Sequence, residues 1–248
     1  APLQAELIDD ELIWEDHFSD NQEITNGAQR TTPAGVTITF TTEVVPPNDP
    51  SFQPHGDNGN DFFRVEHEQL GAHSGFAELG FDNQDYDPND FLRLQLDFSE
   101  PVRELEFSLL DIDSGIGSFF GFTYARWDDG VEVFFNGNNN VRNSPGVSYT
   151  LPSGSASVEE DDESFMNGFE GNETEAPDAQ TVGNVDFDFS STFVNSVEIK
   201  YFSSDDGGFF GPVSQRIGVS DLQYCVPEPS LSALSIILGL LLLQRRGS

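Results

Sequence analysis

The sequence predicts an all-β protein: an antiparallel β-sandwich or jelly roll followed by a C-terminal hydrophobic helix. Three observations support this prediction. Short runs rich in β-branched and aromatic residues recur along the chain, Gly, Pro, Asn and Asp separate them, and no convincing helical period precedes Leu231 apart from a short candidate at 7–18. With 248 residues, the chain is long enough to bury a real core, and one large β domain is the simplest organisation.

The predicted strands follow one another from Val36 onward. The run 36–45 is rich in β-branched residues, and the run 91–98 alternates apolar and polar side chains with period two, as does part of 102–109. The other predicted strands are 119–127, 131–135, 185–189, 194–202 and 217–224. Strands of this length, separated by turns at about ten-residue spacing, are typical of a sandwich or jelly roll.

Charge excludes nucleic acid as the main partner. The chain has 10 Lys and Arg against 44 Asp and Glu, a formal net charge of −34, and its basic residues are scattered except for a pair at the end. Such a surface repels phosphate backbones. The most acidic stretch, 153–180, contains five consecutive acids at 159–163 and predicts a long solvated loop within an exported domain at 1–226.

The last 22 residues, 227–248, form a separate segment. Pro227-Glu228-Pro229 precedes a mostly apolar run at 231–243, and Arg245 and Arg246 follow it. As a helix this run would span about 20 Å, short of the hydrocarbon core of about 30 Å, so it predicts a marginal membrane helix. Positive charge after the run favours a cytoplasmic end, which places 1–226 across the membrane.

These three parts in this order resemble the PEP-CTERM sorting signal of bacterial envelope proteins. The resemblance implies that an exosortase cleaves near Pro227, Glu228 and Pro229, and that Arg245 and Arg246 close the anchor. It further implies export, transient anchoring in the inner membrane, and then a place at the cell surface or in the extracellular matrix, associated with exopolysaccharide or biofilm. The chain opens without Met, and we expect that a signal peptide has been removed.

A second resemblance covers the body of the chain. The segments 109–115, 128–133, 194–201 and 216–224 occur in an order similar to that of exported β-sandwich ectodomains often attached to such anchors. This resemblance implies a fold and carries no activity.

Calcium is the most plausible cofactor, and the sequence otherwise points to none. Oxygen-bearing side chains alternate in one loop, as a hard cation requires, although an ordinary Asx-rich turn would look the same. The loop residues are Asp82, Asp85, Asp87, Asn89 and Asp90, and a shorter candidate is Asp57–Asp61. A second predicted calcium site joins two strands through Asp111, Asp113 and one of Asp128 or Asp129. Solvent-exposed strand ends are the alternative there.

Catalytic motifs are missing from the sequence. It has no G-x-S-x-G nucleophile elbow, its only cysteine is Cys225, and His67 and His73 are spaced six residues apart, so they could not share a zinc ion on one helix face. We therefore expect no enzyme. A carboxylate pair remains the one catalytic alternative, and Trp127 beside Asp128 and Asp129 is where an aromatic wall adjoins two acids.

Three functions follow from these observations. The first is a non-enzymatic surface or matrix protein with a structural or adhesive role. The second is a calcium-dependent carbohydrate-binding module, for which Trp14, Trp127 and the tyrosines could stack on sugars, unless they only fill the core. The third is a jelly-roll enzyme acting on polysaccharides. Expected partners are an exosortase, the membrane and exopolysaccharide.

Overall fold

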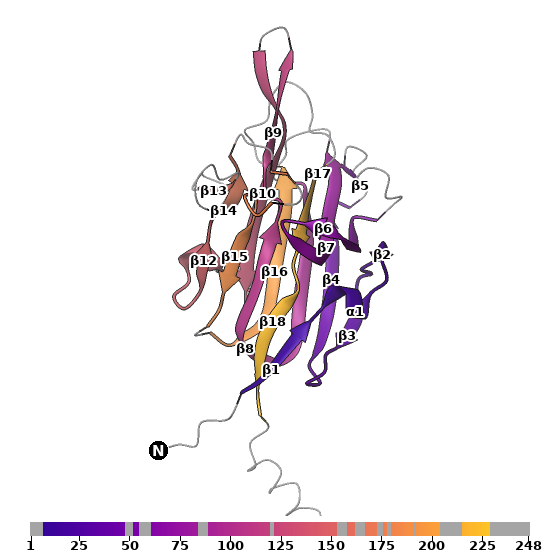
Figure 1. The fold of residues 1–248 in the computed structure, drawn as a ribbon, viewed down its shortest axis with the longest axis vertical. Helices are drawn as coiled ribbons and strands as arrows, with labels where there is room; N and C mark the ends of the chain where they lie inside the picture. Colours follow the sequence, from indigo (N-terminus) through magenta and orange to yellow (C-terminus); the bar gives the residue numbers. More distant parts are fainter. Residues whose placement is uncertain are drawn as a thin grey trace, which may run out of the picture.

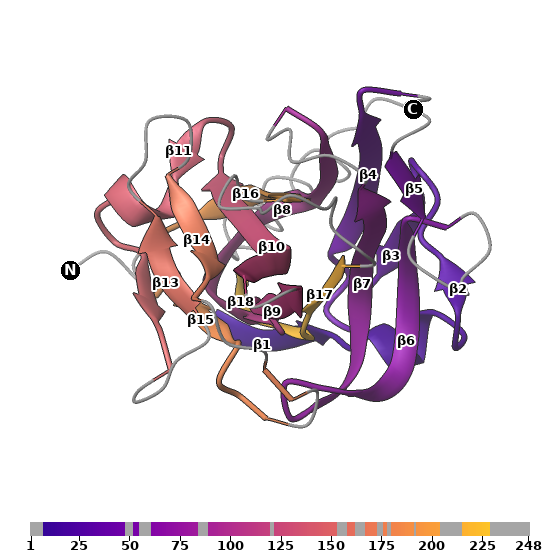
Figure 2. The same ribbon diagram turned by 90° about the horizontal axis from the view of Figure 1, so that it is seen from above.

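Two antiparallel sheets, sheet A and sheet B, form the molecule (Figures 1 and 2). The computed structural model describes residues 7–47, 52–54, 61–83, 89–119, 122–152, 158–161, 167–172, 176–177, 180–190, 192–203 and 215–228. The predicted all-β antiparallel architecture is confirmed, since every strand pairing in the described residues is antiparallel.

Sheet A runs in the order β12, β15, β8, β18, β1. A second branch starts where β17 pairs with the end of β8, and it runs in the order β17, β7, β6, β2. Strand β5 also pairs with β7. The strands are β1 (Leu7–Leu12), β2 (Gln22–Glu23), β5 (Phe52–Pro54), β6 (Phe63–Leu70), β7 (His73–Asn83), β12 (Ser148–Thr150), β15 (Val185–Asp188), β17 (Gln215–Val219) and β18 (Leu222–Pro227).

Sheet B runs in the order β3, β4, β8, β16, β10, β14, β13, and β11 adds to the end of β10. Its strands are β3 (Gln29–Thr31), β4 (Thr37–Val45), β10 (Phe122–Phe135), β11 (Asn139–Asn140), β13 (Val158–Asp161), β14 (Gly168–Gly171) and β16 (Val194–Ser203). A hairpin of β9 (Ser114–Phe119) with the start of β10 projects from one end. The short helices are α1 (Trp14–His17) and η1 (Val141–Asn143).

Strand β8 (Phe91–Leu110) belongs to both sheets. Its first part pairs with β4 and β16 in sheet B, and its last part pairs with β15, β17 and β18 in sheet A. The change of sheet occurs near Pro101, which has no N–H to donate, and Glu104, whose φ is 52°. The sequence predicted separate strands at 91–98 and 102–109, and the structure joins them into one bent strand.

The core lies between the two sheets and is rich in aromatic rings. Phe81 of β7 and Tyr201 of β16 meet across the sheets with ring centroids 4.7 Å apart. Phe107 and Phe187 stack at 5.1 Å. All four side chains are buried. Period-two alternation places such residues inward and their polar neighbours outward, which creates the two outer faces.

Two further elements differ from the sequence-based predictions. Within the predicted acidic loop at 153–180, β13 and β14 form a hairpin that joins sheet B through β10, because Val158 and Phe169 are buried and hold the hairpin to the core. The helical candidate at 7–18 consists of strand β1 and a four-residue helix, because β1 pairs with β18.

The predicted C-terminal helix at 231–243 lies outside the described residues. Within the part of the chain that the structure describes, no helix combines the length and apolar character needed to cross a membrane.

Candidate functional site

The outer face of sheet A carries a row of polar side chains across five neighbouring strands. Strand pairing places them side by side in the order Ser148, Asp188, Glu106, Gln223, Glu11. Their apolar neighbours Phe107, Phe187 and Tyr224 point into the core instead, since side chains alternate along each strand. This arrangement makes the face polar in the middle of the sheet, where the backbone is held rigidly by partners on both sides.

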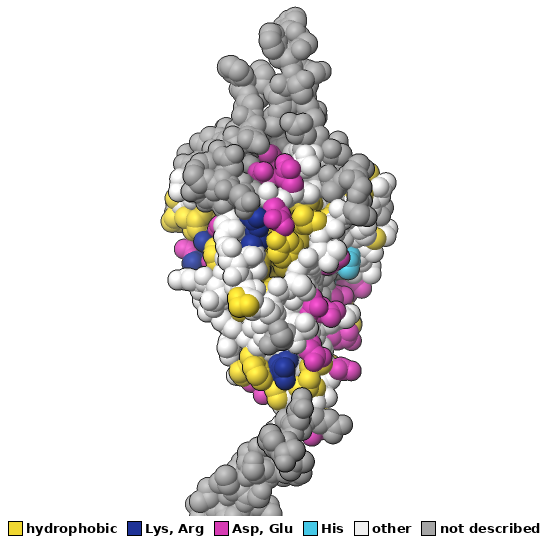
Figure 3. Space-filling model, turned by 90° about the vertical axis from the view of Figure 1, so that its left-hand side faces the viewer, with side chains coloured by type: hydrophobic (Ala, Val, Ile, Leu, Met, Phe, Trp, Pro, Cys, Tyr) yellow, Lys and Arg dark blue, Asp and Glu magenta, His cyan; other side chains and the backbone are white. Residues whose placement is uncertain are grey.

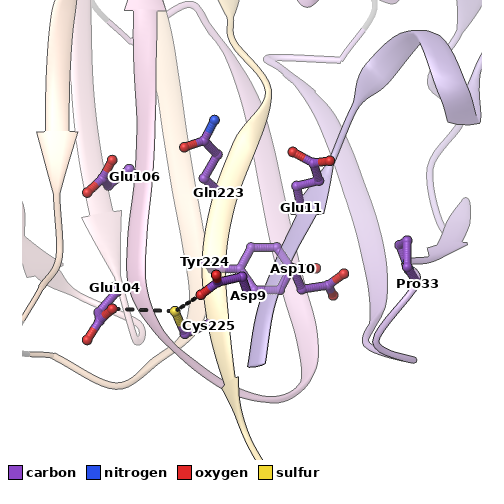
Figure 4. Close-up of a pocket in the computed structure, with 9 residues that line it drawn as sticks. All are labelled: Asp9, Asp10, Glu11, Pro33, Glu104, Glu106, Gln223, Tyr224 and Cys225. Atoms are coloured by element: carbon purple, nitrogen blue, oxygen red, sulfur yellow. Dashed lines mark hydrogen bonds between the residues drawn. The ribbon is translucent and has the colours of Figure 1, made fainter. Parts of the chain in front are cut away.

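A second, shorter row centres on Cys225. Its Sγ lies 3.3 Å from Oδ1 of Asp9 and 3.4 Å from Oε2 of Glu104, so its single hydrogen can be donated to either carboxylate (Figure 4). Burial first, and then the carboxylates of Asp9 and Glu104, raise the pKa of the Cys225 thiol to about 12. The thiol therefore stays protonated at neutral pH, which makes it a hydrogen-bond donor and a poor nucleophile.

Two shallow grooves follow these rows. The first, of about 500 Å³, lies over β1, β8 and β18, and the second, of about 510 Å³, lies over β8, β12, β15 and the β17–β18 junction. Glu106 and Gln223 line both grooves, so the two grooves lie next to each other on the sheet, and we call them together the track. Figure 4 shows Glu106, Gln223 and Glu11 at one level of the first groove and Glu104, Cys225 and Asp9 at another.

Acidic side chains dominate this track. Neither groove has a Lys or Arg among its described lining residues. Its carboxylates are Asp9, Asp10, Glu11, Glu104, Glu106, Asp186, Asp188 and Asp221. Ser108 donates its hydroxyl hydrogen to Oδ1 of Asp186 at 2.6 Å, and the Trp14 backbone N–H donates to Oδ1 of Asp221 at 2.9 Å. In Figure 3, Asp and Glu gather in several groups on the face shown, whereas Lys and Arg are few.

A separate cluster of aspartates is buried where β8, β9 and β10 meet. Asp111, Asp113, Asp128 and Asp129 are each at most 9% exposed. The Asp113 N–H donates to Oδ2 of Asp129 at 3.2 Å, the Asp129 N–H donates to the Asp113 carbonyl at 3.0 Å, and Oδ2 of Asp113 accepts the Ala176 N–H at 2.6 Å. These aspartates are therefore not solvent-exposed strand ends.

Asp129 is the most deeply buried member of this cluster. It is 1% exposed, and its Oδ1 lies 2.6 Å from the Tyr201 hydroxyl. Burial, and then the negative charge of Asp113, raise the pKa of Asp129 well above its usual value. The pair of carboxyls predicted at this corner thus exists, but it sits inside the packed core of the described structure. The side chain of Trp127 lies outside the described part.

The two loops predicted to bind calcium are described only in part. Among the described residues, no group of three or more His, Cys, Asp or Glu side chains could hold a metal ion. In the first loop, Asp82 is half-buried near the end of β7, Asn89 is exposed and Asp90 is buried, while Asp85 and Asp87 lie outside the described residues. In the shorter candidate, only Asp61 is described.

Other residues singled out in the sequence have structural positions. Trp14 is fully buried, and its indole N–H donates to the Ser220 carbonyl at 2.9 Å, so it packs in the core and offers no platform to a sugar. His67 lies 3.1 Å from the Phe18 carbonyl through Nε2, and His73 lines the second groove. Pro227 ends β18 and Glu228 is exposed, whereas Pro229, Arg245 and Arg246 lie outside the described residues.

The grooves were missed by sequence reasoning, although a signal was present. Acids recur at every second position in Asp9-x-Glu11, Glu104-x-Glu106 and Asp186-x-Asp188. Such spacing puts both members of each pair on one face of a strand. What the sequence alone could not supply is the pairing of β1, β8, β15 and β18, which brings the three pairs onto one sheet.

Comparisons with known proteins identify no family for this chain. No protein-family model matches the chain, and no curated protein matches it. Among solved structures, a carbohydrate-binding module that specifically recognises mannan, TmCBM27, aligns with 12% sequence identity and a TM-score of 0.28, over 75% of this chain and 97% of that one.

Proposed function

We propose that this chain is a non-enzymatic polysaccharide-binding module of the bacterial cell surface or extracellular matrix, with a structural or adhesive role. The observation that carries this proposal is the polar track on sheet A, whose two grooves of about 500 and 510 Å³ share Glu106 and Gln223. An open track of this kind accommodates the middle of a polymer, whereas a closed pocket accommodates only an end or a small molecule.

The chemistry of the track suits hydroxyl-rich ligands. Carboxylates such as Glu106 and Asp188 accept hydrogen bonds from sugar hydroxyls, and such charge-assisted bonds are stronger than neutral ones. The Gln223 amide both donates and accepts, and the hydroxyls of Ser148 and Thr150 do the same. Binding relies on these polar groups because Tyr224, Phe107 and Phe187, the aromatic residues that line the grooves, are themselves buried.

A binding role explains this track better than hydrolysis does. A glycosidase needs one carboxylic acid with a raised pKa in a desolvated pocket beside a second carboxylate. Asp9, Glu11, Glu104, Glu106 and Asp186 are exposed to water instead. Burial raises the pKa of Asp221 in the second groove, but this carboxylate accepts the Trp14 backbone N–H and is held in the β17–β18 junction. The carboxyl that does have a strongly raised pKa, Asp129, is sealed in the core away from the grooves.

Delivery of this module is a separate part of the proposal. Its support is the resemblance of 227–248 to a PEP-CTERM sorting signal, with the motif Pro227-Glu228-Pro229 and the terminal pair Arg245 and Arg246. On this proposal the chain is exported, anchored in transit in the inner membrane, processed by an exosortase and released to the surface or matrix. Exopolysaccharide would then be the polymer that the track meets.

The binding function is tested on a polysaccharide array with the wild type and two matched double variants. Glu106→Ala with Gln223→Ala removes the two side chains shared by the grooves. Glu198→Ala with Gln95→Ala removes the same pair of residue types from neighbouring positions on the outer face of sheet B. We expect the groove variant to lose binding and the sheet B variant to keep it.

Two outcomes would contradict the proposal. One is a wild-type chain that binds no polysaccharide on the array. The other is equal loss of binding in the two double variants, because the track would then have no special part in recognition.

A further inference from the structure

The carboxylates of the track have no Lys or Arg beside them among the described lining residues, and His73, near Asp221, is the one basic side chain in that lining. Asp188 and Glu106 occupy directly opposite positions on β15 and β8, an arrangement in which like charges destabilise a sheet. Some acids elsewhere are paired: Arg64 binds Glu66 and Glu78, Arg142 binds Glu160, and Arg216 binds Glu68. None of the groove carboxylates forms an ion pair with another described residue.

The outer face of sheet B also carries a row of charged side chains, but there acidic and basic residues form ion pairs with one another. There the strand pairing puts Glu43, Arg93, Lys200 and Glu132 in one row. Arg93 forms an ion pair with Glu43, and Lys200 lies 3.8 Å from Glu132. The corresponding row on sheet A has acids, Gln and Ser only, so its charge is not balanced within the described protein.

The track is long enough to bind an oligosaccharide that lies across the strands. It crosses β12, β15, β8, β18 and β1, and neighbouring strands are about 4.8 Å apart, so the track is about 20 Å long and spans about four sugar units. Carboxylates occur on β15, β8 and β1 along this line, which presents negative charge to successive units of a bound polymer.

We propose, resting on the polysaccharide-binding function above, that the track selects a cationic polysaccharide whose hexosamine units carry free amines. Each ammonium group would donate hydrogen bonds to carboxylates such as Asp188, Glu106 and Glu11, and ring hydroxyls would bind Gln223 and Ser148. Charge complementarity carries the choice, since an anionic polymer would be repelled and a neutral one would leave these carboxylates unneutralised.

The test compares two tetrasaccharides that differ only at nitrogen, the tetramer of β-1,4-linked glucosamine and its fully N-acetylated form. Binding of each to the full chain is measured by calorimetry at about 0.15 M salt, where long-range attraction is screened beyond about 8 Å. The groove variant combines Asp188→Asn with Glu106→Gln. Its control combines Glu23→Gln with Glu100→Gln, which removes the same charge from exposed positions outside the grooves.

We expect the wild type and the control to bind the amine form about tenfold more tightly than the acetylated form, and the groove variant to lose that preference. Equal binding of both tetramers, lost in the groove variant, would overturn the selectivity and leave the proposed polysaccharide binding intact. Absence of binding to either tetramer would overturn the selectivity too, while the array decides the proposed function separately. Equal weakening in the groove variant and the control would mean diffuse attraction to an acidic protein, and would also contradict the inference.

Discussion

Asp129 shows how one residue links burial to pH-dependent stability. Its carboxyl is enclosed between the Tyr201 hydroxyl and the Asp113 N–H, and the described structure gives it no cationic partner. Because burial and the charge of Asp113 raise its pKa in the folded state, the folded protein holds a proton that the unfolded chain releases above about pH 4. The free energy of unfolding should therefore fall as pH rises from about 4 towards the raised pKa of Asp129 in the folded state.

Replacement of Asp129 with Asn tests this coupling. An amide copies the shape and neutral state of the protonated carboxyl but cannot ionise, so Asp129→Asn should unfold with a higher free energy than the wild type at pH 8. The difference should shrink as pH falls towards 4. Urea denaturation at several pH values measures it, and Tyr201→Phe, which keeps the carboxyl, serves as the control. If the free energies of unfolding of the Asp129→Asn variant and the wild type differ by the same amount at all pH values, the raised pKa of Asp129 is contradicted.

Among the elements, strands with a clear period were predictable and their partners were not. The runs at 36–45 and 194–202 correspond to β4 and β16, since β-branched and aromatic residues alternate there with polar ones. The bend in β8 escaped prediction because it depends on register changes near Pro101 and Glu104. The acids of β13 concealed a strand, since only Val158 of that element is apolar.

The candidate site was less predictable than the strands. Sequence reasoning found the aspartates at 111, 113 and 128 because they are close in sequence or flank obvious strands. It missed Glu106 and Asp188, because their importance comes from contact between strands about 80 residues apart in the chain. An acid in a strand has no local signature of a site until the sheet order is known.

The packing of β14 against the β8–β9 connection gives a prediction for an element. A Cβ at Gly171 would lie 2.3 Å from the Asp113 carbonyl carbon and oxygen, both of which belong to the backbone and cannot rotate away. Gly171→Ala should therefore force β14 outward and lower the free energy of unfolding by about 1–3 kcal/mol. Gly137→Ala is a useful comparison, because its φ of 89° also disfavours alanine but no atom lies within 4 Å of the added Cβ. Urea denaturation should show the larger loss for Gly171→Ala.

At the scale of the whole molecule, the net charge of −34 makes cations a factor in stability. Calcium, proposed from the loop at 82–90, would raise the free energy of unfolding by about 2.7 kcal/mol at one hundred times its dissociation constant if it binds only the folded state. Millimolar Ca²⁺ should then raise the melting temperature more than Mg²⁺ or NaCl at equal ionic strength. Equal shifts for all three salts in a thermal denaturation series would mean general screening and would contradict a calcium site.

The ends of the described chain meet at one pole of the sandwich. Leu7 of β1 pairs with Pro227 of β18, and the β9–β10 hairpin projects from the opposite pole (Figure 1). The first groove also reaches this pole, since Cys225 is two residues before Pro227. The described chain therefore ends at the pole that the first groove reaches. The fate of 227–248 bears on where the proposed module is delivered.

Replacement of Pro227, Glu228 and Pro229 by alanine in the native host tests that fate. Glu228 is exposed and Pro227 lies at the end of its strand, so the sandwich should still fold, and a near-UV circular dichroism spectrum checks this. If the motif directs processing, the variant should accumulate unprocessed in the inner membrane, as fractionation and mass spectrometry of its C-terminus would show. Alanine at Gln22 and Glu23, in the edge strand β2 of sheet A, should leave processing unchanged. A normal mature C-terminus and a normal surface level in the motif variant would mean that the tail is not a sorting signal, because a folded module would then reach the surface without it.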